Sequence, residues 1–223
     1  MNRFVFAALA VAFASGTSAM AADLVVDEPA DVAVPTGFYA TFFAGGSFAS
    51  GDTTIDFGGG GLTLETDLDA GFIIGGAIGT TIHENLRGEV EFSYIQAGVD
   101  TIGGSPVPPG LEATSRGYNL LANVWYDFEN DSGFTPYVGA GVGIGSTEVS
   151  GDLPDVSAVG LLYQLGAGFK VEVAQNIDLD VGYRYRVLSD ADTTQAGAPP
   201  PPGVTVTTDA TNHIVQAGLT FGF

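Results

Sequence analysis

Two histidines are the side chains of this sequence best suited to acid–base chemistry. His83 lies in a short polar segment, whereas His213 lies in the last alternating segment, where Ser189 or Asp209 could complete a His–Ser or His–Asp pair. No surrounding motif supports a catalytic role for such a pair. The interpretation of His213 as an interfacial histidine without a catalytic task is therefore favoured, and we expect no catalytic residue. Two distant histidines without any cysteine also predict no metal site and no cofactor.

Charged residues at every second position form a larger chemical pattern. Each alternates with apolar residues, and successive side chains of a strand point to opposite faces, so the charges share one face. This predicted charge cluster comprises Arg87, Glu89, Glu91, Asp127, Lys170, Glu172, Asp178, Asp180, Arg184 and Arg186. A face of this kind could line an ion-selective pore, or it could form a polar interior in which the charges neutralise one another.

Eight segments with period-two alternation must position these charges. They lie at about 38–48, 70–82, 86–97, 116–128, 135–146, 158–173, 177–188 and 211–223, with short connections at 83–85, 129–133 and 174–176 and long ones at 49–69, 98–115, 147–157 and 189–210. Short turns alternating with long loops are typical of outer-membrane barrels. We therefore predict an all-β fold, an eight-stranded antiparallel transmembrane β-barrel with up-and-down topology and both chain ends on the short-turn side.

The alternation does not by itself say which face points inward, because a soluble lipocalin-like barrel also has eight strands and encloses an apolar ligand. Lipid exposure of Arg or Lys near the bilayer midplane costs roughly 2–4 kcal/mol, which favours the charges inside. Aromatic residues near strand ends fit interfacial girdles. The short turn at 174–176 places Lys170 opposite Asp180 and predicts an ion pair there, and the glycine-rich face of 135–146 predicts room for Trp125, Tyr137 and the arginines.

The first residues are typical of an export signal. Arg3 precedes an apolar run from Phe4 to Ala14, and Ala19-Met20-Ala21 resembles a signal-peptidase site. Eleven apolar residues are too few to cross about 30 Å of hydrocarbon as a helix. We predict a signal peptide at 1–21, an acidic periplasmic tail at 22–36 and a barrel domain at 37–223. The 26 acidic and 6 basic residues argue against nucleic acid as a partner.

The last residues carry a resemblance to a known family. Gln216, Gly218, Phe221 and Phe223 follow the pattern polar, x, Gly, x, x, apolar, x, aromatic, which resembles the signal read by the barrel-assembly machinery. The stretches 136–143 and 179–185 are similar to the fifth and seventh strands of the outer-membrane β-barrel (opacity-type, OmpA-like) porin family. The start Ala22-Asp23-Leu24, with the acidic, proline-containing segment to Pro35, resembles family members of alphaproteobacterial type. The resemblance implies insertion into a Gram-negative outer membrane, with lipid, lipopolysaccharide and the assembly machinery as partners.

Three functions are compatible with such a barrel. The sequence favours a structural, non-enzymatic outer-membrane protein with exposed surface loops, because eight strands enclose an interior that their own side chains just fill. A narrow porin-like channel for small solutes is the alternative, and a lipid-modifying enzyme is the third. Loops carry the particular function of a barrel, and here they consist mainly of Gly, Pro, Thr and Asp, so the loop ligands stay open.

Overall fold

A computed structural model describes residues 37–108, 110–130, 132–152, 156–195 and 204–223. The regular structure in these ranges is entirely β: β1 (Phe38–Asp56), β2 (Gly61–Leu68), β3 (Gly71–His83), β4 (Leu86–Ile102), β5 (Ser105–Pro106), β6 (Ala113–Asp127), β7 (Phe134–Gly151), β8 (Val156–Ala174), β9 (Ile177–Gln195) and β10 (Thr205–Gly222). These ranges contain no helix that is long and apolar enough to cross a membrane. The predicted signal peptide and acidic tail lie outside the described residues and stay predictions.

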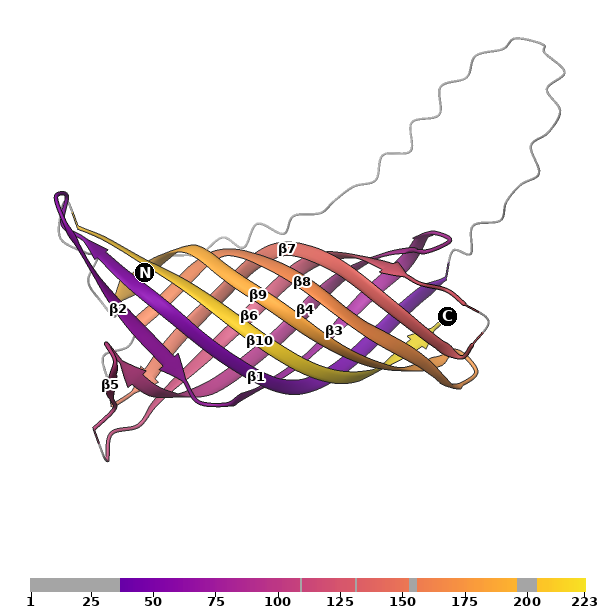
Figure 1. The fold of residues 1–223 in the computed structure, drawn as a ribbon, viewed down its shortest axis with the longest axis horizontal. Helices are drawn as coiled ribbons and strands as arrows, with labels where there is room; N and C mark the ends of the chain where they lie inside the picture. The colour runs from indigo at the N-terminus through magenta and orange to yellow at the C-terminus, as the bar shows by residue number, and fades with distance from the viewer. Residues whose placement is uncertain (1–36, 109, 131, 153–155, 196–203) are drawn as a thin grey trace, which may run out of the picture. The chain divides into compact units, whose positions relative to one another are not determined.

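The sheet closes on itself because the first and last long strands pair along their whole length. β1 and β10 are antiparallel from Tyr39–Gly222 to Asp56–Thr205. β2 and β3 together form one wall strand, since β3 pairs with the first half of β1 and β2 with its second half. Every other long strand pairs with its sequence neighbour. The result is a ring of eight antiparallel wall strands (Figure 1), which confirms the predicted fold class.

The register sets the width of this ring. The line of paired residues that starts at Tyr39 passes around all strands and returns to β1 at Ala49, a stagger of ten residues. Eight strands with that stagger tilt by about 40° and lie on a cylinder of about 8 Å radius. An interior of this width is one that inward side chains just fill.

Large apolar side chains lie mainly on the outside of the ring, which is the reverse of a soluble protein. Examples from different strands are Phe42, Ile78, Val142, Leu165 and Val215, each more than half exposed. The inward positions carry polar and charged side chains instead. A lipocalin-like barrel with an apolar interior is therefore excluded, and lipid is the cover that the outer face requires.

Aromatic residues of the outer face gather at the short-turn end. The C-terminus lies at the same end of the barrel (Figure 1). Phe42 and Phe221 meet edge to face with ring centroids 6.4 Å apart, and Phe134 stacks on Phe169 at 4.9 Å. A second group, Tyr94 with Tyr118 at 5.2 Å, packs farther along the strands. Such belts fit the two interfaces of a bilayer, as the sequence predicted.

The long connections are shorter than predicted, because most of their residues continue the strands. The segment 49–69 is a hairpin of β1 and β2 around a turn at 57–60, β7 and β8 extend to Gly151 and from Val156, and β9 and β10 extend to Gln195 and from Thr205. These extensions carry mainly polar residues and therefore lack the apolar alternation that marks the rest of the wall strands. Cross-strand hydroxyl pairs join them instead, such as Thr53 with Thr208 at 3.1 Å and Ser50 with Thr211 at 3.3 Å.

A charge on the lipid face should destabilise the barrel. Val142 lies in the middle of β7 and is 52% exposed, so Val142→Arg should lower the free energy of unfolding in lipid vesicles by about 2–4 kcal/mol. Leu62→Arg is the matched control, because Leu62 is 51% exposed but lies on the β1–β2 hairpin. Urea titration followed by tryptophan fluorescence measures both, and equal effects would contradict a lipid-facing Val142.

Candidate functional site

A three-member ion cluster closes the short-turn end of the interior. Arg87 on β4 holds Asp127 on β6 with two parallel hydrogen bonds, from Nε at 2.7 Å and Nη2 at 2.9 Å. Lys170 on β8 adds a third charged contact to Asp127 at 2.8 Å. Arg87 also donates to the hydroxyl of Tyr39, which in turn donates to Glu89 at 3.0 Å. Charge-assisted bonds of this kind are strong and geometrically specific.

A second cluster crosses the middle of the barrel. Arg186 on β9 forms an ion pair with Glu91 on β4 and donates to Ser93 at 2.9 Å. Three wall strands separate β4 from β9 on either side of the ring, so these bonds bridge opposite walls. Gln164 on β8 accepts a hydrogen bond from Arg186 at 2.6 Å and donates one to Asn123 on β6 at 3.1 Å. These bonds connect the bridge between Arg186 and Glu91 to the strands that lie between β4 and β9.

A third cluster surrounds the single tryptophan. The guanidinium of Arg184 lies 4.2 Å from the ring centroid of Trp125, a cation–π contact shielded from water. Arg184 also donates to the hydroxyl of Tyr137 at 3.1 Å, and that hydroxyl donates to Asp180 at 2.6 Å. Arg87 of the first cluster lies 5.5 Å from the ring centroid of Tyr137, and Asn123 joins the first cluster to the second through bonds to Glu89 and Glu91. We call the three clusters together the lumen network.

Glycines of β7, β8 and β9 make room for the large members of the network. A Cβ on Gly139 would collide with the ring of Trp125, and one on Gly166 would lie 2.7 Å from Arg184 and 2.8 Å from Trp125. A Cβ on Gly182 would lie 2.7 Å from the hydroxyl of Tyr137. The predicted role of the glycines in β7 is thus confirmed for Trp125, whereas the room for Tyr137 and Arg184 comes from β8 and β9.

The structure brings eight of the ten predicted charges into the network. These are Arg87, Glu89, Glu91, Asp127, Lys170, Asp180, Arg184 and Arg186, four cations and four anions whose formal charges cancel. Glu172 is exposed near the β8–β9 turn, and Asp178 lines the opening at the short-turn end, so neither contributes. Parity gives a face but not a depth along the barrel, so it did not separate these two residues from the other eight.

The predicted ion pair between Lys170 and Asp180 does not form, although the predicted register of β8 and β9 is correct. The two residues are directly paired across β8 and β9. Lys170 nevertheless binds Asp127, and Asp180 accepts from Tyr137. Because the strands are tilted, side chains at the same depth in the interior come from strands that are not neighbours.

Sequence reasoning did not single out four neutral members of the network. These are Tyr39, Ser93, Asn123 and Gln164, which bond to the charges, whereas Trp125 and Tyr137 were expected in the interior. All four lie at inward positions of their strands, which is the signal that could have identified them. Parity cannot, however, say which of several inward residues will meet across the interior.

The four residues of the predicted assembly signal lie on both faces of β10. Gln216 is buried in the interior, and Gly218 packs so closely on β1 that a Cβ would lie 2.9 Å from the Cβ of Phe43. Phe221 contacts Phe42 on the outer face. Phe223 donates its backbone N–H to the carbonyl of Phe38 at 2.9 Å, while its side chain is 75% exposed.

The histidines lie outside the network. His213 is on the outer face of β10, where its Nδ1 is hydrogen-bonded to the hydroxyl of Tyr183 at 2.6 Å and its ring packs on Tyr185. This aromatic cluster resembles an interfacial belt. His83 is exposed at the end of β3. Within the described ranges, no three His, Cys, Asp or Glu side chains are grouped so that they could hold a metal ion.

The network leaves little free space among its members. Two buried polar atoms in this region, Nε of Arg184 and Oε1 of Gln216, have no partner within the described part of the chain. Both residues line a cavity of about 10 Å³, which is close to the space that one water needs. The arrangement is thus that of a filled polar core.

Comparison with known families matches this architecture. The sequence model described as "Outer membrane protein beta-barrel domain" matches residues 6–223, almost the whole chain. The chain belongs to this outer-membrane β-barrel family. Membership agrees with the apolar outer face and the closed ring, and it assigns the chain to the outer membrane of Gram-negative bacteria.

Individual relatives agree with the family. Over 145 residues the chain is 29% identical to the outer membrane protein PagN of Salmonella typhimurium, an alignment that covers 60% of this chain and 59% of PagN. The crystal structure of Neisserial surface protein A has a TM-score of 0.50 at 21% identity and covers 81% of this chain and 97% of its own. OprG of Pseudomonas aeruginosa scores 0.48 at 16% identity, covering 82% and 95%. The Neisserial likeness supports the fold alone.

Breaking the bridge across the barrel should cost more than any surface change. Glu91→Gln leaves Arg186 charged and buried, each residue being 1% exposed, so the free energy of unfolding should fall by about 3–5 kcal/mol. Urea titration followed by the fluorescence of Trp125 measures the loss. Glu172→Gln, on an exposed carboxylate, is the control and should change stability by less than about 0.5 kcal/mol.

A double variant separates an unpaired charge from lost packing. Glu91→Leu with Arg186→Met removes both charges and should recover most of the stability lost in Glu91→Gln, because a buried pair is often no better than apolar residues of similar size. A double variant as unstable as the single one would contradict the ion-pair explanation.

Proposed function

We propose that this protein is a structural, non-enzymatic barrel of the outer membrane whose interior is closed to solutes. The observation that carries the proposal is the contact of Arg186 with Glu91 and Ser93, which joins opposite walls in the middle of the barrel. The long-loop end would then be the part exposed to the cell surface. A surface-exposed barrel of this kind needs no conducting interior to present its loops.

The energetics of the bridge support a closed interior over a narrow channel. Arg186 and Glu91 are each 1% exposed, so opening a path through them would separate two charges that have little access to water. Removing one partner of such a pair typically costs several kcal/mol. Below the bridge, Arg87, Asp127 and Lys170 form a second closed layer, so a solute would have to break both.

Planar-bilayer recording tests the closed interior. The refolded protein should insert and give no unitary current steps, because two layers of bonded charges obstruct the path. A Glu91→Ala, Arg186→Ala double variant provides the sensitivity control, since it removes the bridge and should raise the conductance above the wild-type background. Steady unitary steps from the wild-type protein would contradict the proposal and favour the narrow porin-like channel.

The partners that fit this function are those of the envelope. The apolar outer face would contact outer-membrane lipid and lipopolysaccharide, and the signal peptide at 1–21 would direct export. The acidic tail at 22–36 would lie in the periplasm, on the short-turn side. The motifs at 136–143 and 179–185 support assignment to opacity-type barrels, and the start Ala22-Asp23-Leu24 with its acidic segment to Pro35 supports the alphaproteobacterial type.

The barrel-assembly machinery is the remaining proposed partner, and Phe223 tests it. In the folded barrel its side chain is 75% exposed and its strand contact uses the backbone, which alanine keeps. Phe223→Ala should therefore reduce the amount of protein in outer-membrane fractions several-fold while the refolded protein keeps its free energy of unfolding within about 0.5 kcal/mol.

Phe128→Ala is the matched control for this experiment. Phe128 follows β6 at the same end of the barrel and is 47% exposed, but it lies outside the terminal motif. Its loss should leave the outer-membrane level unchanged. Normal levels of Phe223→Ala, or equal losses in both variants, would contradict a role of Phe223 in recognition by the assembly machinery.

A further inference from the structure

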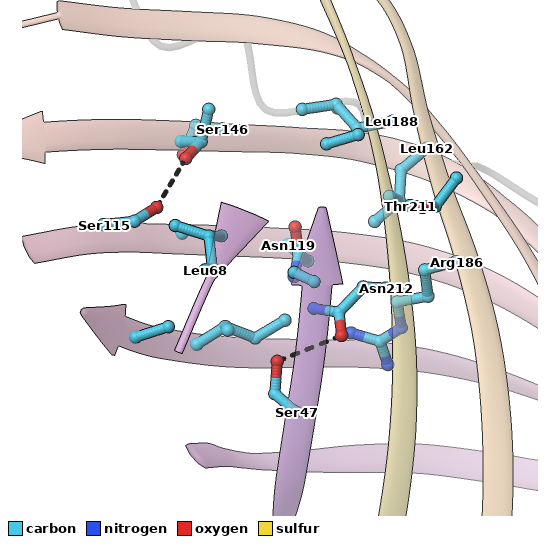
Figure 2. A pocket seen from close by; sticks show the side chains of 16 residues that line it. Ser47, Leu68, Ser115, Asn119, Ser146, Leu162, Arg186, Leu188, Thr211 and Asn212 are labelled. Atoms are coloured by element: carbon cyan, nitrogen blue, oxygen red, sulfur yellow. Dashed lines mark hydrogen bonds between the residues drawn. The ribbon is translucent and has the colours of Figure 1, made fainter. Parts of the chain in front are cut away.

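The outer end of the interior differs in chemistry from the lumen network beneath it. Here the barrel opens into a cavity of about 80 Å³, which we call the outer cup (Figure 2). Most of its wall is apolar, and five strands contribute these apolar side chains to it: Leu68, Ile95, Ala97, Leu162, Leu188 and Ala210. The lumen network lies between the cup and the short-turn end, so the cup is closed below.

Two carboxamides face this apolar cup. Asn119 on β6 is only 7% exposed, and its side chain has no hydrogen-bond partner within the part of the chain that the structure describes. Asn212 on β10 accepts a bond from Ser47 at 3.0 Å and leaves its amide nitrogen free of a partner within the same ranges. Both residues line the cavity (Figure 2), from opposite walls of the ring. The carboxamide of Asn119 is therefore available to bond to a molecule in the cup as donor or acceptor.

Among the side chains that the structure describes, the cup offers no free charge to a ligand. Arg186 is the only charged one of these along the lining, and its three guanidinium nitrogens donate to Gln164, Ser93 and Glu91, members of the network below. The other polar side chains of the wall are largely paired with each other, as Ser115 is with Thr147 at 3.2 Å. An ion entering the cup would lose its hydration without gaining a partner, which is costly.

We propose that the outer cup binds a small neutral molecule with an apolar body and one hydrogen-bonding group. The aliphatic walls would cover the apolar body, and the carboxamide of Asn119 would bond to the polar group as donor or acceptor. Because the network closes the cup from below, the molecule would enter and leave from the cell surface. The site is thus a receptor-like recess rather than part of a path through the membrane.

The size of the cavity sets the expected affinity. Its 80 Å³ exceeds the space for one water several-fold and suits a molecule of roughly eight non-hydrogen atoms. Such a molecule should bind with a dissociation constant on the order of 1 mM, given typical binding energies per atom. Benzyl alcohol is a suitable probe, with toluene as the analogue without a hydroxyl and benzoate as the charged analogue.

Solution NMR of the refolded, ¹⁵N-labelled protein in detergent micelles tests the proposal. Benzyl alcohol should shift the side-chain amides of Asn119 and Asn212 saturably, toluene should bind about threefold to tenfold more weakly, and benzoate should not bind. Asn119→Leu should remove the difference between benzyl alcohol and toluene, because the hydroxyl loses its partner. No saturable shift in the cup, or equal binding of benzoate, would overturn the proposal.

A matched pair of variants separates the cup from the micelle. Leu162→Phe fills the cavity and should weaken benzyl alcohol at least tenfold, whereas Leu161→Phe alters the adjacent, lipid-facing position and should leave binding within twofold. If Leu162→Phe does not fold, Ala97→Leu narrows the same cavity from β4. Unchanged binding in the filled variants would overturn the proposal. Bilayer conductance decides the closed interior separately, so the two ideas can fail independently.

Discussion

The pairing of β1 with β10 is the constraint on which the rest of this structure depends. In hydrocarbon every backbone N–H and C=O must be satisfied within the protein, so a sheet can span the membrane only when its edges meet. Closure with eight wall strands and a stagger of ten residues then fixes an interior of about 8 Å backbone radius. That width explains why glycines are paired with Trp125 and Arg184 on the neighbouring strands. In so narrow a ring, a Cβ on Gly139 or Gly166 would collide with the large side chain with which it is paired.

Closure also decides where the charges of this chain can be. The sequence has six Lys and Arg residues, and Arg87, Lys170, Arg184 and Arg186 all lie in the lumen network. The lumen network takes one anion for each of these cations. Of the other two cations, Arg3 precedes the barrel in sequence and Arg116 is exposed on β6. Among the described residues, acidic side chains outside the network such as Asp52, Glu65 and Asp152 are exposed, which keeps the extended hairpins hydrated and repels polyanions.

The fold could be predicted from sequence because its signal is local and repeated. Alternation across eight segments gave the wall strands, their order and the charged face, and the turn at 174–176 gave the correct register of Lys170 with Asp180. The partners within the site could not be predicted. Arg186 meets Glu91 from the opposite wall, a contact that depends on tilt and diameter rather than on position in the chain. The strand extensions beyond the apolar region were missed for another reason: their polar alternation carries no hydrophobic period.

The strand register determines which residues face lipid and which face the interior, because successive side chains of a strand point to opposite faces. A slip of β9 by one residue would turn Arg184 and Arg186 toward lipid, at roughly 2–4 kcal/mol each, and would bring Tyr183 and Tyr185 into space already filled by Trp125 and Tyr137. The same slip would leave Glu91 and Asp180 without their cation partners. Each wall strand that contributes to the network therefore excludes its own neighbouring registers. The buried charges add specificity even where a pair by itself stabilises little, and they allow a chain without disulfides to close in only one way.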